Sequence, residues 1–112
     1  MAVTVTVLIP AKIAEDAQTT QYTAPAGITT IIDKFTATNF SGSSATLSVN
    51  LVTGGDTAGN QNLIIVNKSL TAGQTYTFPE ITGQALATAG FISTIASAAD
   101  SITIRSNGRQ VS

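Results

Sequence analysis

The chain has 112 residues, which fits one domain and is too short for two independent cores. Charged residues make up only 10% of it, and its five basic residues are scattered, so neither a phosphate-binding stripe nor a nucleic-acid partner is expected. Cys and His are both absent, which removes disulfides, thiolate metal sites and the commonest general base. We therefore expect a single domain over residues 1–112 that is not an enzyme and has no cofactor, metal or catalytic site.

Residues 3–9 (VTVTVLI) alternate in the period of a half-buried strand, with Val3, Val5, Val7 and Ile9 predicted on one side. Pro10 lacks a backbone donor, so the pairing is expected to stop or bulge there. The start has no basic segment typical of a signal peptide, and no apolar run is long enough for a membrane helix. Residues 1–10 are a candidate interaction strand, because an apolar strand at a chain end can add to a neighbour's sheet.

A short strand is expected at residues 19–24, followed by a longer one over residues 28–40. On the longer strand, alternation puts Ile31, Asp33 and Phe35 on one face and Ile32 on the other. Without a partner His in the chain, Asp33 is interpreted as a structural carboxylate at a strand end or bulge near solvent. The next strand is predicted where Leu and Val alternate with polar residues over 46–51.

Residues 53–62 (TGGDTAGNQN) are glycine-rich but lack the Lys and the following helix of a phosphate-binding loop. They are interpreted as a flexible exposed loop before a strand at 63–68, and as a fair contact surface. A further strand over 75–78 is expected to place Tyr76 and Phe78 in the core. Residues 81–89 have room for one helical turn at most, because Gly83 and Thr82 disfavour a helix.

The last strands are predicted around residues 91–96 and 101–104, where apolar and small polar residues alternate. Asn107-Gly108 is a turn signal, so the tail is expected either to return as a short edge strand or to fray. The whole pattern predicts an all-β fold, a two-sheet antiparallel β-sandwich of jelly-roll or immunoglobulin-like type with seven to eight strands.

Other motifs carry weak functional signals. The Glu15/Asp16 pair and Asp56 are too isolated to predict a calcium site. Asn39 and Asn67 each begin an N-x-[ST] pattern, which we interpret as coincidental in a Ser-rich chain. Four Phe and two Tyr without Trp are too few and too dispersed for a stacking platform that binds sugars or bases.

Six segments stand out together in chain order: 21–27 (QYTAPAG), 30–39 (TIIDKFTATN), 45–49 (ATLSV), 70–76 (LTAGQTY), 79–80 (PE) and 86–92 (LATAGFI). In this order they resemble the small β-sandwich virion proteins of tailed bacteriophages. The resemblance spans roughly residues 18–108 and is one of strand and turn types. The Gly-Asp step usual in such families before the final strands is Ala89-Gly90 here.

The resemblance implies a capsid decoration or cement protein that binds the capsid surface and bridges neighbouring subunits. Its partners would be the major capsid protein or another virion protein, and it would act as a homo-oligomer, a dimer or trimer, located in the virion after synthesis in the bacterial cytoplasm. Alternatives are a collar, head-tail or tail-associated protein, or a receptor- or carbohydrate-binding β-sandwich module. No nucleic-acid or membrane partner is expected.

Overall fold

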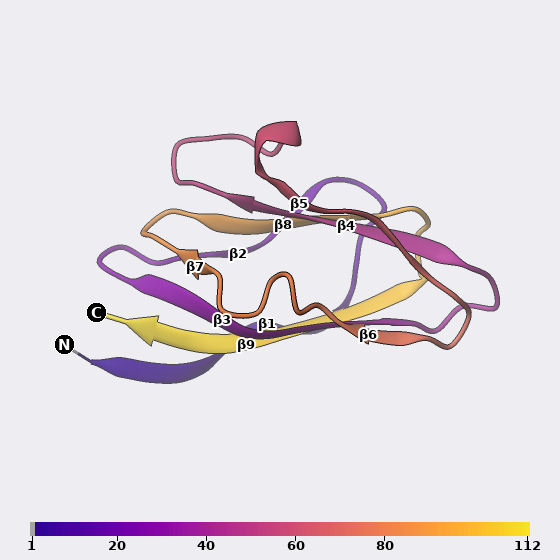
Figure 1. Cartoon of the computed structure of the whole chain (residues 1–112), viewed down its shortest axis with the longest axis horizontal. Helices are drawn as coiled ribbons and strands as arrows, with labels where there is room; N and C mark the ends of the chain where they lie inside the picture. Colours follow the sequence, from indigo (N-terminus) through magenta and orange to yellow (C-terminus); the bar gives the residue numbers. More distant parts are fainter. Residues whose placement is uncertain (1) are drawn as a thin grey trace.

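A computed structural model describes residues 2–112, which form two antiparallel sheets packed face to face (Figure 1). The described part measures 46 × 26 × 20 Å along its principal axes. Its regular structure is β, apart from one short 3-10 turn. The predicted all-β, two-sheet antiparallel sandwich is therefore confirmed.

Thr, Val and Ile dominate the strands, because β-branched side chains suit a pleated surface buried on one side. The first sheet has the order β1-β9-β3-β6, with β7 pairing the other end of β3. Its strands are β1 (Val3–Ile13), β9 (Ile102–Val111), β3 (Thr29–Asn39), β6 (Thr75–Thr77) and β7 (Ala85–Leu86).

The second sheet has the order β2-β8-β4-β5. Its strands are β2 (Thr19–Thr23), β8 (Phe91–Ala96), β4 (Ala45–Val52) and β5 (Leu63–Leu70), with the 3-10 turn η1 (Asn60–Asn62) between β4 and β5. Most connections cross from one sheet to the other, and only β4–β5 and β6–β7 stay within one sheet. This order is the jelly-roll topology, which decides between the two predicted sandwich types.

Residues 2–112 contain nine strands, more than the seven to eight predicted, because one strand position is divided. β6 and β7 both pair with β3, and the turn between them bends away before the chain returns to the sheet. The Phe78 and Gly83 amides donate to carbonyls of β3, and Ile81 is buried under the turn. The weak helical pattern over residues 81–89 thus produces a single turn followed by a strand.

The core lies between the sheets and centres on the edge-to-face pair Phe35 and Phe78, with ring centroids 5.4 Å apart. Tyr76 continues this stack 4.8 Å from Phe78 but is only half-buried, at the margin rather than in the predicted core. The Lys68 ammonium of β5 lies 4.2 Å from the Tyr76 ring centroid, so this contact joins the edges of the two sheets.

A bulge in β3 corrects the predicted faces of that strand. Ile32 is paired with Gly108 and Lys34 with Asn107, so Asp33 is an extra residue that has no paired residue on β9. The extra residue shifts the alternation, and Ile32 joins Phe35 in the core while Ile31 is only half-buried. The prediction that placed Ile31 with Phe35 and Ile32 opposite is wrong for this reason.

A similar shift occurs in β1. The strand continues through Pro10 to Ile13, with register shifts between Val7 and Ile9 and between Ile9 and Lys12. Leu8 and Ile9 are therefore both buried, although strict alternation puts them on opposite sides. Of the predicted outcomes at Pro10, a bulge is the one observed.

The tail is part of a central strand, so the expectation of a turn at Asn107-Gly108 followed by a short edge strand or a frayed end is wrong. Residues 102–111 run without interruption between β1 and β3. Gly108 is needed here because a Cβ would overlap the carbonyl oxygen of Ile31 and lie 3.1 Å from Leu8 Cδ1. The glycine that indicates a turn locally thus serves a close approach of two strands.

Candidate interaction surface

The carboxylates singled out in the sequence are mostly engaged with neighbouring side chains. Glu15 lies 3.0 Å from the Lys12 ammonium and accepts a 2.9 Å bond from Gln21. The hydrogen bond from Gln21, helped by that from Lys12, lowers the pKa of Glu15 below its ordinary 4.5. Asp16 follows without such partners, and no cluster of three metal-ligating groups occurs among residues 2–112.

Asp33 stands at the bulge and forms a forked ion pair with Arg109 across the outer face of the first sheet. Both carboxylate oxygens accept from the guanidinium, at 2.9–3.1 Å. The hydrogen bonds to the Asp33 carboxylate, helped by its negative charge, raise the pKa of Arg109 above its ordinary value. The interpretation of Asp33 as a structural residue at a bulge near solvent agrees with this geometry, which joins β3 to β9.

The loop over residues 53–62 is exposed at its start but tied down at its end. Asp56 accepts from the Thr57 amide at 2.8 Å, and this bond, followed by that from Gln61, lowers the pKa of the carboxyl. Asn62 is buried, accepting from Asn50 Nδ2 at 2.8 Å and donating to the Thr57 carbonyl at 2.9 Å. Asp56 therefore organises a turn rather than coordinating a ligand in concert with other acids.

The anchored end of this loop covers a polar row on the outer face of the second sheet. Asn50 of β4 and Ser93 of β8 are opposite each other and nearly fully buried. Gln18 Nε2 donates to Asn50 Oδ1 at 3.2 Å and to Ser93 Oγ at 2.7 Å. These polar groups have partners within the chain, so the row serves as a structural seam.

The two N-x-[ST] asparagines have different environments. Asn39 is fully buried and donates from Nδ2 to the carbonyls of Ser43 and Leu70, both at 2.8 Å. Its amide nitrogen is therefore inaccessible to a glycosylating enzyme, which agrees with the interpretation of this motif as coincidental. Asn67 is exposed on β5 and has a positive φ of 46°.

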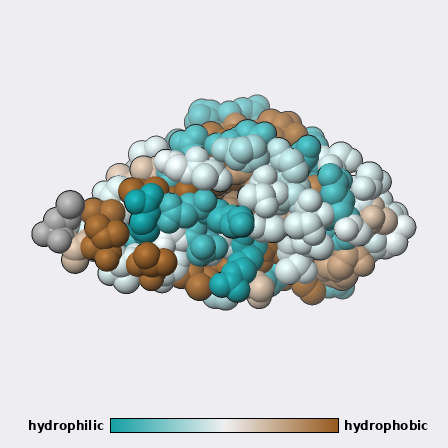
Figure 2. All heavy atoms as spheres, turned by 60° about the horizontal axis from the view of Figure 1, so that its bottom comes forward, coloured by the Kyte–Doolittle hydropathy of each residue, from teal (hydrophilic) through white to brown (hydrophobic). Residues whose placement is uncertain are grey.

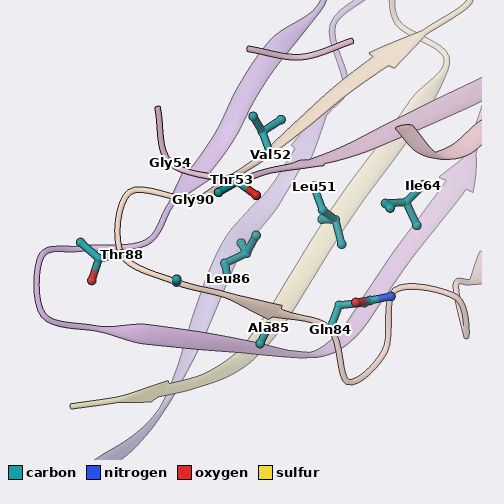
Figure 3. A pocket seen from close by; sticks show the side chains of 11 residues that line it. Leu51, Val52, Thr53, Gly54, Ile64, Gln84, Ala85, Leu86, Thr88 and Gly90 are labelled. Carbon is teal, nitrogen blue, oxygen red and sulfur yellow. The ribbon is translucent and has the colours of Figure 1, made fainter. Parts of the chain in front are cut away.

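One end of the sandwich contains an open hollow of about 380 Å³ between β4, β5 and the β7–β8 loop (Figure 3). Leu51, Ile64 and Leu86 form its apolar side, and Gln84 and Thr88 lie at its margin. The lining includes neither an aromatic nor a charged side chain. It has a volume within the range of ligand pockets, but it lacks the convergent polar groups that orient a ligand.

The most exposed large apolar side chain among the described residues is Val5 of β1, an edge strand of the first sheet, followed by Val66 of β5. Val3, Val5 and Val7 are 54%, 78% and 45% exposed and point to the same outer face. Figure 2 shows hydrophobic atoms gathered at the end of the molecule where both termini lie. These three valines and their backbone, here called the β1 edge, form the candidate interaction surface.

The structure shows how the expected interaction strand is held. Residues 3–13 pair with β9 along their length, so they form an ordered edge strand rather than a detached arm. Sequence reasoning placed the valines on one face but expected Ile9 beside them, whereas Ile9 is in the core. That this strand contacts a neighbouring molecule stays a prediction.

Comparisons with known proteins assign no family. No family model matches the chain, and no curated protein matches it. One solved structure that it resembles is titled "Structure of infectious bursal disease virus Gx strain", with 16% sequence identity and a TM-score of 0.48. The match covers 97% of this chain and 32% of that chain, so the chain spans about a third of the viral chain's length.

Fold and surface together define the class. The part of the chain that the structure describes is a jelly-roll β-sandwich domain with three exposed valines on the edge strand β1. Within residues 2–112, no helix meets the length and hydrophobicity needed to cross a membrane.

Proposed function

We propose that this protein is a non-enzymatic structural protein of a virion, acting as a capsid decoration or cement protein that binds the capsid surface and bridges neighbouring subunits. The observation that carries the proposal is the β1 edge, where exposed valines adjoin an unpaired strand edge. Soluble proteins ordinarily protect such edges with charge, proline or a covering loop. An unprotected edge is suited to a contact with another protein.

The composition and the resemblance support the same proposal. Because only 10% of its residues are charged, the chain has few charged groups that lose solvation when it packs against a shell. The order of strands and turns over residues 18–108 resembles small virion proteins of tailed bacteriophages. The partner we propose is the major capsid protein or another virion protein, with the protein made in the bacterial cytoplasm.

A non-catalytic role is part of the proposal. The chain lacks His and Cys, and Lys12, Glu15, Asp33 and Arg109 are engaged in ion pairs. A general base would have to come from the few remaining acids or lysines, and the hollow of Figure 3 includes none of them.

Quantitative mass spectrometry of purified particles of the virus that encodes the chain tests this function. A decoration protein is expected in a copy number comparable to that of capsid subunits, and purified protein should co-sediment with capsids that lack it. A few copies per particle would instead indicate the collar, head-tail or tail role. Absence from particles together with glycan-array binding would indicate the carbohydrate-binding alternative.

A further inference from the structure

The open side of β1 presents backbone groups in a regular order. The Ser112 amide donates to the Ala2 carbonyl at 2.9 Å, so Ala2 is a hydrogen-bonded position of the β1–β9 ladder. In an antiparallel ladder such positions alternate, and therefore Thr4 and Thr6 also direct their backbone groups toward β9. The N–H and C=O groups of Val3, Val5 and Val7 consequently point to the open side.

The same five residues are self-complementary. Residues 3–7 read V-T-V-T-V, which is identical in both directions about Val5. An antiparallel copy with Val5 on a two-fold axis places Val3 opposite the second Val7 and Thr4 opposite the second Thr6. Each outward-pointing valine then meets another outward-pointing valine, which is the requirement for hydrogen-bonded pairs.

The charges around the β1 edge permit this pairing. Lys12 is the first charged side chain of the sequence, so residues 3–7 of two copies meet without charge repulsion between their side chains. Arg109, which lies beside Val5 on β9, is already neutralised by Asp33. A second uncharged strand of the same pattern therefore fits this edge better than a charged segment, which would lose solvation without gaining a partner.

The other sheet edges are less suitable. β5 is interrupted by Asn67 at a positive φ and carries Lys68, β2 has five residues, and β6 and β7 are shorter still. Leu8 and Ile9 are buried, so the first exposed stretch of β1 ends at Val7, and Pro10 and Lys12 lie beyond it. The self-complementary residues and the first exposed stretch of β1 thus coincide.

We propose that two copies of this chain associate through antiparallel β1 edges centred on Val5, which joins their first sheets into one continuous sheet. The contact is short compared with stable interfaces, so the isolated protein is expected to be in a concentration-dependent monomer–dimer equilibrium. The use of this dimer to bridge capsid subunits rests on the proposed function, because a shell that holds two copies close raises their effective concentration.

Single cysteines test the register, because the chain has no native Cys. In a Val5→Cys variant the two-fold pair has Cα atoms about 5.5 Å apart, within disulfide range. In Val3→Cys alone the two thiols lie about 14 Å apart along the strands. In a glutathione redox buffer, V5C should form disulfide dimers, V3C and V7C alone should not, and a mixture of V3C and V7C should.

A Val66→Cys variant measures random collisions, because Val66 is an exposed valine on β5. Crosslinking of V66C or V3C to the same extent as V5C would overturn the proposed register. Crosslinking of the V3C and V7C mixture above each variant alone supports it independently of V5C.

Sedimentation equilibrium without crosslinks tests the association itself. Val5→Lys places two ammonium groups on the axis and should raise the dimer Kd at least tenfold, while Val66→Lys should leave it unchanged. A wild-type chain that stays monomeric over the whole concentration range, or equal effects of V5K and V66K, would overturn the inference. Capsid binding by such a monomer would leave the proposed function standing, whereas a dimer that ignores capsids would remove that function alone.

Discussion

Gly108 shows how one residue in the middle of a strand can limit the fold. A Cβ there would overlap the carbonyl oxygen of Ile31, whereas a Cβ on Gly42 meets no atom within 4 Å. We expect Gly108→Ala to lower the free energy of unfolding by about 2–3 kcal/mol, because backbone must move to relieve the overlap. Urea unfolding measures this, with Gly42→Ala as the control. Equal midpoints for the two variants would contradict the close approach.

Asn39 connects three segments of the fold by its side chain. Its Nδ2 donates to the Ser43 and Leu70 carbonyls, and its Oδ1 accepts from the Ser41 amide. In Asn39→Asp a carboxylate oxygen faces two carbonyls in a buried site, which we expect to cost about 3–5 kcal/mol at neutral pH. The exposed Asn67→Asp change is the control.

The Asn39→Asp defect should also depend on pH. Burial and the two carbonyls raise the pKa of the new carboxyl in the folded state, because the protonated form can donate one hydrogen bond. The protonated folded form is favoured below the unfolded-state pKa, and that advantage is lost as the pH rises through the folded-state value. Thermal unfolding should therefore show N39D approaching the wild type as the pH is lowered. A pH-independent deficit would contradict this explanation.

Glu15 is expected to show the opposite pH dependence. Its folded-state pKa is lowered by the bonds from Gln21 and Lys12, so its stabilising effect is present above 4.5 and is lost as the pH falls through the lower folded value. Both charged groups are well exposed, and we expect Glu15→Gln to cost no more than about 0.5 kcal/mol at pH 7. The melting-temperature gap between wild type and E15Q should close toward pH 3. A gap that persists at pH 3 would show that packing, not charge, is responsible.

The structural role of Asp33 was predictable from the sequence, whereas the role of Gly108 was not, for a physical reason. A lone carboxylate in a chain without His has few catalytic partners, and that fact is visible in the composition. The need for glycine at position 108 arises from β3, more than 70 residues away, so a local reading favours a turn.

At the scale of elements, the Asn62 side chain anchors the β4–β5 loop, because it bonds both to β4 and to the backbone within the loop. Asn62 accepts from the Gly59 amide at 3.1 Å and from Asn50 at 2.8 Å. Asn62→Ala should release the loop at a cost of about 1–2 kcal/mol, with faster hydrogen exchange at the Gly59 amide. Asn60→Ala, at an exposed position of the same turn, is the control. Unchanged exchange at Gly59 would contradict this anchoring role.

Strand positions followed from alternation, but bulges did not. The period of two is a local property, and it located β4 and β8 within one or two residues. Asp33 and the β1 shifts reflect mismatches with β9, a partner that a short window does not contain. The sequence predicted the candidate surface because the valine alternation is a local pattern. It did not predict the burial of Ile9, because that depends on a bulge caused by the pairing with β9.

At the scale of the molecule, the topology combines distant segments. The central strand β9 comes last in the chain and closes the first sheet between β1 and β3. A sandwich of two sheets was predictable from strand number and length, whereas the choice of jelly-roll over immunoglobulin-like order depends on which strands pair. Pairing over more than 70 residues leaves no mark in local sequence patterns.

The whole domain should respond differently to two truncations of β1. Removal of residues 2–7 takes away the first exposed stretch of the strand, while removal of residues 2–9 also takes Leu8 and Ile9 from the core. Each of these two losses costs about 2–5 kcal/mol, a large share of the roughly 5–15 kcal/mol that stabilises a typical domain. We expect the shorter deletion to leave a cooperative unfolding transition in urea and the longer one to abolish it. Equal unfolding midpoints would contradict the assignment of Leu8 and Ile9 to the core, and retained dimerisation by the shorter variant would contradict the β1 interface.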